Sequence, residues 1–145
     1  MKIFVDANIL VAVVNREYPL FSYASRVLSL PEFGNYSLYT SPICLAIAFY
    51  FAEKKSGRAV AGKKLALIAR HIGIAAVDEY VVQRTIRQEN VSDFEDGLEY
   101  FAAENAGCEI IVTENPGDFH FGKLRVMRAE EMIVYCLDAS KIRQK

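Results

Sequence analysis

Short apolar runs alternate along the chain with longer stretches in which apolar residues recur at helical spacing. The apolar runs have the length of buried β-strands and span residues 3–5, 38–40, 74–77, 110–113 and 124–127. The stretches between them predict helices over residues 8–15, 19–30, 42–55, 58–71 and 79–90. Strands that are apolar almost throughout and alternate with helices are typical of a parallel sheet covered on both faces, so the pattern predicts an α/β fold.

The clearest helix signal begins at residue 92. The sequence S-D-F-E over residues 92–95 matches a capping box, in which two side chains bind the free N–H groups of a helix start. Phe94, Leu98 and Phe101 then recur at helical spacing and are expected to face the core. Gly107 stands where a C-terminal cap belongs, so we expect the helix to end just before it.

A chain of 145 residues is long enough to form one domain that folds without disulfide bonds. No linker, repeat or low-complexity segment divides it, so a single domain over residues 1–145 is expected. Its three cysteines, Cys44, Cys108 and Cys136, lie far apart in apolar runs, which indicates reduced thiols in a cytoplasmic protein. Asp6 and Asn8 interrupt the first apolar run, so we expect neither a secretory segment nor a membrane span.

Charge is segregated along the chain although the net charge is only −1. Residues 53–71 carry six basic residues and one acidic residue, a net +5, whereas residues 78–118 carry two basic and eleven acidic residues, a net −9. In one interpretation both segments are solvated helix faces. In the other they have separate functions, and the basic residues bind phosphates while the acidic residues bind a metal. In the second interpretation the candidate RNA-binding residues are Lys54, Lys55, Arg58, Lys63 and Lys64.

Carboxylates from three separate segments are expected at one edge of the sheet. Asp6 directly follows the first strand, and Asp118 follows the fourth. Asp93 and Asp96 lie three residues apart in the first turn of the helix that begins at residue 92. Singly, such acids are explained by the helix dipole or by a turn, but together they repel one another unless a cation neutralises them. Because no histidine or cysteine is expected nearby, the oxygen ligands predict magnesium or manganese rather than zinc.

Polar residues next to these acids are expected to support them. Asn8 either caps the following helix or holds the Asp6 carboxylate, and Thr113 and Asn115 bring a hydroxyl and an amide to the same edge. Gly97 is expected to leave room beside the acids of its helix.

At these positions the chain resembles the PIN-domain family, particularly small stand-alone members such as the VapC-type ribonuclease toxins. The resemblance rests on V-D-A-N-I-L over residues 5–10, D-F-E-D-G-L over residues 93–98, and I-V-T-E-N over residues 111–115 with Asp118 and Phe119. It implies a three-layer α/β/α fold with a parallel sheet in strand order 3-2-1-4-5. It also implies metal-dependent cleavage of RNA that leaves 5′-phosphate and 3′-hydroxyl ends, an antitoxin protein as partner, and a homodimer.

The same resemblance assigns roles to individual residues. Asp6 matches the family's first metal ligand, Asp96 its central helical acid, and Asn115 or Asp118 the acid after the fourth strand. The implied catalytic residues are therefore Asp6, Asp96 and Asp118, and with Asp93 they are the candidate ligands of Mg²⁺ or Mn²⁺.

One position departs from the family pattern. The family carries a glutamate early in the helix after the second strand, but residues 40–48 contain no acid and Ile47 stands in its place. Glu53 is six residues further on and is rotated by about 240° from Ile47, so it is no obvious substitute. Asp93, one turn from Asp96, is a candidate replacement ligand.

Three functions are compatible with these features. The first is a metal-dependent ribonuclease, such as the toxin of a toxin-antitoxin pair, and the second is a PIN fold that binds RNA or a protein partner but cleaves poorly because Ile47 replaces a ligand. The third, a phosphoacceptor receiver domain, requires paired acids after the first strand and a lysine after the fifth. Asp6 is single and Lys123 precedes the fifth predicted strand, so the sequence favours the first two.

Overall fold

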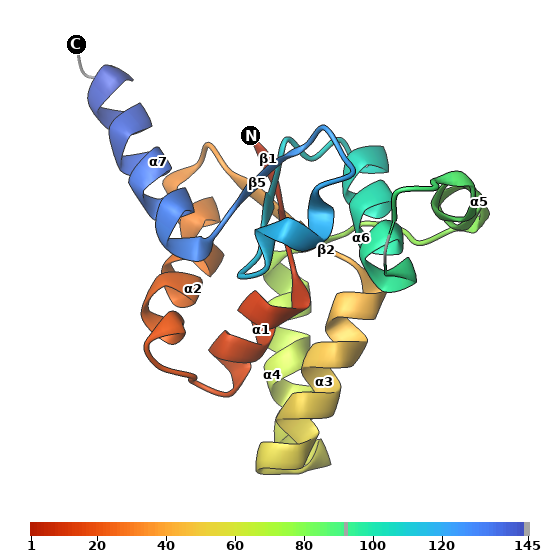
Figure 1. The fold of residues 1–145 in the computed structure, drawn as a ribbon. Helices are drawn as coiled ribbons and strands as arrows, with labels where there is room; N and C mark the ends of the chain where they lie inside the picture. The colour runs from red at the N-terminus through yellow and green to blue at the C-terminus, as the bar shows by residue number, and fades with distance from the viewer. Residues whose placement is uncertain (92, 144–145) are drawn as a thin grey trace.

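A five-stranded parallel sheet lies at the centre of the part of the chain that the structure describes (Figure 1). The structure is a computed structural model and describes residues 1–91 and 93–143. The sheet has the order β3-β2-β1-β4-β5, and its strands are β1 Lys2–Val5, β2 Ser37–Thr40, β3 Gly73–Ile74, β4 Ile110–Val112 and β5 Arg125–Met127. The predicted α/β class and the implied strand order 3-2-1-4-5 are both confirmed.

The helices agree with the predicted ones at their centres and differ by a few residues at their ends. They are α1 Ala7–Val14, α2 Leu20–Leu28, α3 Pro42–Ser56, α4 Arg58–His71, α5 Glu79–Arg87, α6 Phe94–Asn105 and α7 Ala129–Arg143, with short 3-10 helices η1 Leu30–Phe33 and η2 Pro116–Phe119. The sequence pattern does not predict α7, because residues 132–137 form one continuous apolar run rather than a helical repeat. Among the described helices, none is both long and apolar enough to span a membrane.

Helices cover both faces of the sheet. α1 to α4 connect β1, β2 and β3 in one direction, and α5 and α6 then return the chain past β1 to β4, so right-handed crossovers put the two groups on opposite faces. In Figure 1, α5 and α6 lie on one side of the sheet and α2 on the other, where α7 packs against it. α3 and α4 run side by side and project beyond the edge at which β1 ends (Figure 1).

The strand order reverses at β1, which pairs with β2 on one side and β4 on the other. Val5 lies opposite Val112, and the N–H of Asp6 extends this pairing by donating to the Val112 carbonyl at 3.0 Å. Open parallel sheets bind ligands at such a switch point, outside the carboxyl ends of the strands. Receiver domains have the order 2-1-3-4-5, so the receiver interpretation is wrong.

The amino end of α6 differs from its prediction. Ser92 lies outside the described residues, and the N-cap is Asp93, whose carboxylate accepts the Glu95 N–H at 2.9 Å. Leu98 and Phe101 are buried in the core as predicted, but Phe94 is 52% exposed because it begins the helix at the edge of the molecule.

Two glycines fix the position of α6. Gly107 has φ +77° and follows the C-cap, so the predicted C-terminal stop is confirmed. The sequence suggested that Gly97 leaves room for the acids of its helix. In the structure it instead leaves room for α5 and the loop that follows α5. A Cβ at residue 97 would lie 2.5 Å from Thr85 Cγ2 and 2.8 Å from Val91 Cγ1. Glycine is therefore what lets α5 and the loop after it approach α6.

Gly97→Ala is expected to lower the free energy of unfolding by about 1–3 kcal/mol, because the added methyl group forces α5 and α6 apart. Gly62→Ala in α4 is the matched control, since no atom lies within 4 Å of a Cβ at that position. Alanine is the better helix former by up to about 1 kcal/mol, so the control should be neutral or stabilising. Urea unfolding measures both, and equal stability of the two variants would contradict the close packing at Gly97.

Candidate functional site

Asp6 lies where β1 ends and α1 begins, and its position is fixed by the backbone on both sides. It is the N-cap of α1, with Oδ1 accepting the Ala7 N–H at 2.6 Å. Its side chain is only 8% exposed, and its own N–H is bound to β4 through Val112. The carboxylate is thus held at the switch point rather than left free in solvent.

Side chains from α1 and the end of β4 hold the second oxygen of Asp6. The Thr113 hydroxyl donates to Asp6 Oδ2 at 2.6 Å, and Asn8 Nδ2 donates to the same oxygen at 3.2 Å and to Thr113 Oγ1 at 3.1 Å. Asn8 in turn accepts the Glu114 N–H at 3.2 Å, and Thr113 accepts the Asn115 N–H at 3.1 Å. Asn8 therefore positions the carboxylate and is not the helix cap, and Asn115 contributes through its backbone.

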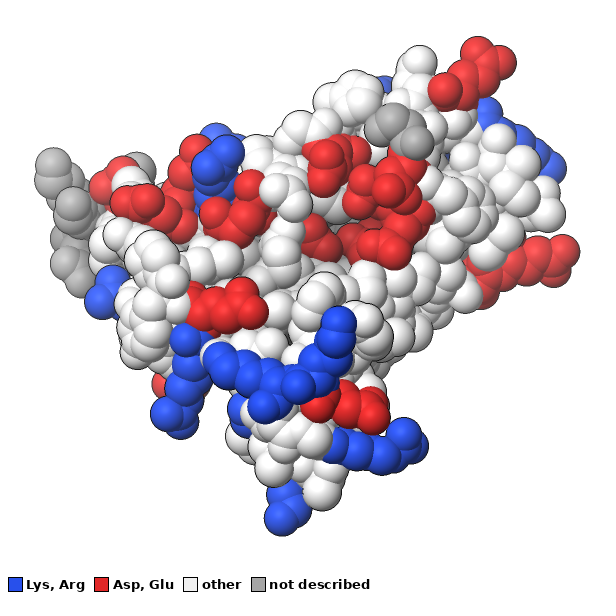
Figure 2. Space-filling view, turned by 60° about the horizontal axis from the view of Figure 1, so that its bottom comes forward, with Lys and Arg blue, Asp and Glu red and all other residues white. Residues whose placement is uncertain are grey.

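The acids of α6 and η2 share an electrostatic environment with Asp6. The pKa of Asp96 is raised to about 7, first by burial and then by the nearby carboxylates of Asp118, Asp93 and Asp6 in that order. The pKa of Glu95 is also raised, by burial and then by Asp93 and Asp6. Asp118, Asp93 and Asp6 thus each lie near Asp96, and Figure 2 shows acidic side chains gathered on one face of the molecule.

Asp93 has a structural partner within this group. Its carboxylate caps α6 by accepting the Glu95 N–H, while the side chain itself is exposed. A carboxylate has several lone pairs, so capping and cation binding are compatible. The contact present in the structure is the N-cap of α6, so the primary role assigned to Asp93 is to cap this helix.

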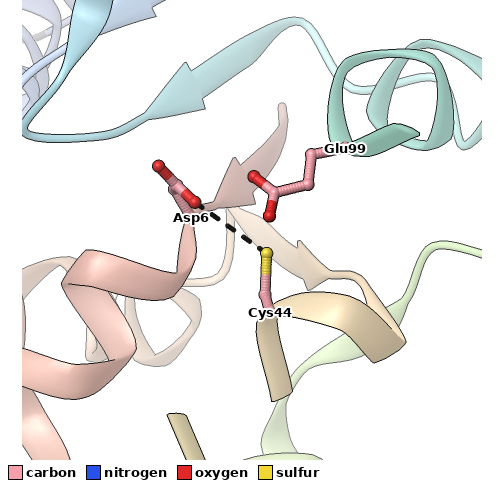
Figure 3. Close-up of side chains that lie close together, drawn as sticks. All are labelled: Asp6, Cys44 and Glu99. Atoms are coloured by element: carbon pink, nitrogen blue, oxygen red, sulfur yellow. Dashed lines mark hydrogen bonds between the residues drawn. The ribbon is translucent and has the colours of Figure 1, made fainter. Parts of the chain in front are cut away.

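Two further residues, which sequence reasoning missed, lie directly against Asp6. Glu99 comes from α6 and Cys44 from α3, and one donor atom from each lies within 4.8 Å of an Asp6 oxygen and of the other (Figure 3). The Cys44 thiol donates to Asp6 Oδ1 at 3.9 Å. Glu99 stands three residues after Asp96, a helical spacing that would have placed both on one face of α6.

Glu99 is an unusual buried acid. Its side chain is 1% exposed, and neither carboxylate oxygen has a hydrogen-bond partner in the described structure. Burial, and next the negative charge of Asp6, raise its pKa to about 10. The pKa of the Cys44 thiol is also raised well above its usual value, mainly by burial and then by Glu99 and Asp6.

These features fit a divalent cation. Buried carboxylates that repel one another and lack partners are stabilised when a positive charge is placed between them. Asp118, Asp93 and Asp6 lie near enough to Asp96 to raise its pKa, whereas the donor atoms found within 4.8 Å of one another among the described residues are those of Asp6, Cys44 and Glu99. The expectation that no cysteine lies near the acids is wrong, because Cys44 is in contact with Asp6.

α3 supplies a thiol to this site but no carboxylate from its described residues. Ser41 is the N-cap of α3 and accepts the Cys44 N–H at 3.1 Å, which orients the first turn toward Asp6. Ile47, one turn further on, is half-buried and packs against the core, while Glu53 is exposed.

The basic residues of α3 and α4 lie at the projecting end of these helices, where Figure 2 shows lysines and arginines gathered apart from the acidic group. Two of the candidate RNA-binding lysines already have partners in the fold. The amino group of Lys64 donates to the Val14 carbonyl at 2.6 Å, and that of Lys55 donates to the Asn15 carbonyl. Both thereby bind the carboxyl end of α1.

The other three candidates are exposed and have looser contacts. Lys54 lies 5.0 Å from the centre of the Tyr50 ring, and Arg58 lies 5.8 Å from that of Phe49. Lys63 is exposed on α4. These side chains remain available to bind an anionic ligand.

The fold and site described above agree with a known family. The model of the PIN domain family matches residues 2–116 of this chain. The chain therefore belongs to the PIN domain family.

Individual relatives are distant in sequence but extend over most of the chain. Ribonuclease VapC1 of Aquifex aeolicus (strain VF5) is 24% identical over 137 residues, 90% of this chain and 92% of that protein. VapBC2 from Rickettsia felis, solved with a DNA fragment from its promoter, gives a TM-score of 0.71 at 18% identity and covers 88% of this chain and 98% of that one. A toxin-antitoxin complex from Klebsiella pneumoniae gives a TM-score of 0.66 at 20% identity and covers 87% of this chain and 96% of that one. The two structures are similar to this chain in fold.

Asp96→Asn is expected to stabilise the metal-free protein at neutral and alkaline pH. The pKa of Asp96 in the folded protein is raised from its usual value to about 7. Between about pH 4 and pH 7 Asp96 is ionised in the unfolded chain but still protonated in the folded one, so the free energy of unfolding of the wild type falls as the pH rises. The amide lacks this penalty and should gain about 1–2 kcal/mol above pH 7, because solvent screens part of the repulsion. At pH 4 the two proteins should be equally stable.

Urea unfolding in EDTA across this pH range measures the difference. Glu32→Gln, an exposed acid on η1 before β2, is the matched control and should show no such pH-dependent gain. If Asp96→Asn is no more stable than wild type at pH 8, burial and the neighbouring carboxylates do not destabilise the ionised form of Asp96.

Proposed function

We propose that this protein is a divalent-cation-dependent endoribonuclease that acts at the Asp6 site. The observation that carries the proposal is that Asp6, at the switch point of the sheet, and Asp118 lie near enough to Asp96 to raise its pKa. Membership of the PIN domain family and the likeness to a protein named as a ribonuclease support it. The functional domain is taken as residues 1–145, because β5 completes the sheet and α7 packs against α2.

The carboxylates act by holding a cation between themselves and the anionic RNA backbone. Without it, the acidic cluster would repel a phosphodiester. Mg²⁺ or Mn²⁺, when bound, supplies Lewis-acid polarisation of the phosphate and neutralises charge that develops in the transition state. Asp6 is the fixed ligand, because Thr113 and Asn8 hold Oδ2 and the Ala7 N–H holds Oδ1. Asp96 of α6 and Asp118 of η2 are proposed to complete the oxygen donors.

The phosphate backbone is proposed to cross the projecting end of α3 and α4. Lys54, Arg58 and Lys63 are the free cations there, whereas Lys55 and Lys64 are proposed to serve mainly the fold through α1. Phosphate contacts of this kind position a nucleic acid without reading its sequence. The proposed RNA path therefore joins a basic surface to an acidic cleavage site.

A protein partner is also proposed. A structure with the same fold is described as a toxin-antitoxin complex, which supports an antitoxin that covers this chain. A homodimer and a cytoplasmic location remain predictions.

A second function is favoured by one observation, the lack of a carboxylate facing Asp6 among the described residues of α3. A PIN fold with fewer anionic ligands would bind its cation weakly and hold RNA or a protein without efficient cleavage. Ile47 is the position at which this alternative arises.

Asp6→Asn is expected to reduce RNA cleavage by at least about 100-fold, because the substitution removes the fixed anionic ligand while the amide keeps a similar shape. The assay uses purified protein, a fluorescent RNA and Mn²⁺, with an EDTA control. Glu32→Gln should cleave like wild type. Unchanged cleavage by Asp6→Asn would contradict the ribonuclease proposal, and RNA binding without any cleavage in wild type would establish the second function.

Replacing Lys54 and Lys63 together by glutamine should flatten the dependence of RNA affinity on salt. Each phosphate contact to a single strand contributes a logarithmic slope of about 0.7, so the loss of two should reduce the slope by about 1 to 1.5. Fluorescence anisotropy in the Asp6→Asn background measures binding without cleavage. Arg26→Gln on α2 is the control, and a slope unchanged in the double variant would mean that RNA does not cross this surface.

A further inference from the structure

Glu99 is a buried acid whose two carboxyl oxygens form no hydrogen bond of normal geometry in the described structure. Both oxygens lack a partner although the side chain is 1% exposed. Carboxylates in protein interiors are otherwise hydrogen-bonded, paired with a cation or bound to a metal, since an unpaired one is costly to bury. The Asp6 carboxyl and the Cys44 thiol lie within reach of Glu99 but neither carries a positive charge, so an ionised Glu99 needs a cation as its partner.

The surroundings of Glu99 identify that partner as a cation. The groups nearest to it are Asp6 and Cys44, an acid and a thiol, and their donor atoms lie within 4.8 Å of one another (Figure 3). Two donors bound to the same ion at about 2.1–2.3 Å each lie at most about 4.4 Å apart. The 3.9 Å between Cys44 Sγ and Asp6 Oδ1 is within that limit. Small side-chain movements would bring Glu99 to the same distance.

The three donors are held by separate rigid elements. Asp6 follows β1, Cys44 lies in the first turn of α3, and Glu99 lies in the middle of α6. Thr113 and Asn8 occupy Asp6 Oδ2, so Oδ1 is the oxygen that faces Cys44. Donor atoms supported in this way are characteristic of metal sites with a fixed geometry.

We propose that Asp6, Cys44 and Glu99 form the inner ligands of a divalent transition-metal site, and that the sulfur ligand makes this centre select Co²⁺ or Zn²⁺ over Mg²⁺. Thiolates are soft ligands that bind Zn²⁺ and Co²⁺ well, whereas Mg²⁺ takes oxygen ligands in a strict octahedron. Glu99 supplies from α6 a carboxylate that α3 does not. The proposal refines the cation and ligand set of the ribonuclease site and rests on Asp6 being part of it.

Co²⁺ is the probe that tests this ligand set without any cleavage assay. Bound to a thiolate, Co²⁺ acquires a sulfur-to-metal charge-transfer absorption in the near ultraviolet that oxygen ligands do not give. Wild-type protein titrated with Co²⁺ should show this band. Cys44→Ser should lose it, while Cys108→Ser, which removes another buried thiol, should keep it.

Calorimetry tests the role of Glu99. Glu99→Gln preserves size and neutral hydrogen-bonding capacity, and it should weaken Mn²⁺ and Co²⁺ binding at least about tenfold. Wild type should bind Co²⁺ at least about tenfold more tightly than Mg²⁺, and Cys44→Ser should reduce this ratio of affinities. Circular dichroism checks that each variant is folded. If Glu99→Gln does not fold, the Co²⁺ spectra of wild type and Cys44→Ser still decide the question.

The outcomes separate this inference from the proposed function. A Co²⁺ complex without the charge-transfer band, or one whose band survives Cys44→Ser, overturns the sulfur ligand. Unchanged metal affinity in folded Glu99→Gln shows that Glu99 is only a neutral buried acid. If either result accompanies normal Mn²⁺-dependent RNA cleavage, the ribonuclease stands and the inner ligand set fails. If the charge-transfer band depends on Cys44 but the protein does not cleave RNA, the inner ligand set stands and the ribonuclease proposal fails.

Discussion

The fixed carboxylate of Asp6 is the constraint on which the rest of the site depends. Its backbone N–H binds Val112 at the end of β4, one oxygen caps α1, and the other is held by Thr113 and Asn8. One residue thereby ties together the central strand, its neighbour and the first helix. Because β1 and β4 are buried along almost their whole length, the carboxylate cannot move away from the charges gathered around it.

The cost of this arrangement is repulsion, which burial makes stronger. The pKa of Asp96 is raised to about 7 and that of Glu99 to about 10, first by burial and then by neighbouring acids. In the proposed site a cation would reverse the sign of these interactions, so that the groups that destabilise the metal-free fold would become its ligands. Stability sacrificed in this way is typical of functional sites, and it makes metal binding and folding energetically linked.

The sequence predicts the fold class and the position of Asp6 at the sheet edge, because both depend on local rules. Apolar runs mark the buried strands, and a residue directly after a parallel strand, such as Asp6, must emerge at the carboxyl edge. Cys44 and Glu99 escape such rules, since their proximity depends on how α3 and α6 pack across the sheet edge. The same holds for Lys55 and Lys64, whose partners on α1 are about forty to fifty residues away in sequence. α7 is missed because a continuous apolar run has no helical period to detect.

Crystals grown with Mn²⁺ and measured for anomalous scattering test the account most directly. The account predicts an anomalous peak within about 2.2 Å of an Asp6 oxygen. At least one carboxylate of α6, Asp96 or Glu99, should coordinate the same ion. A well-ordered Asp6 with no peak beside it, or manganese found only at carboxylates away from the switch point, would contradict the claim that this site exists to hold a cation.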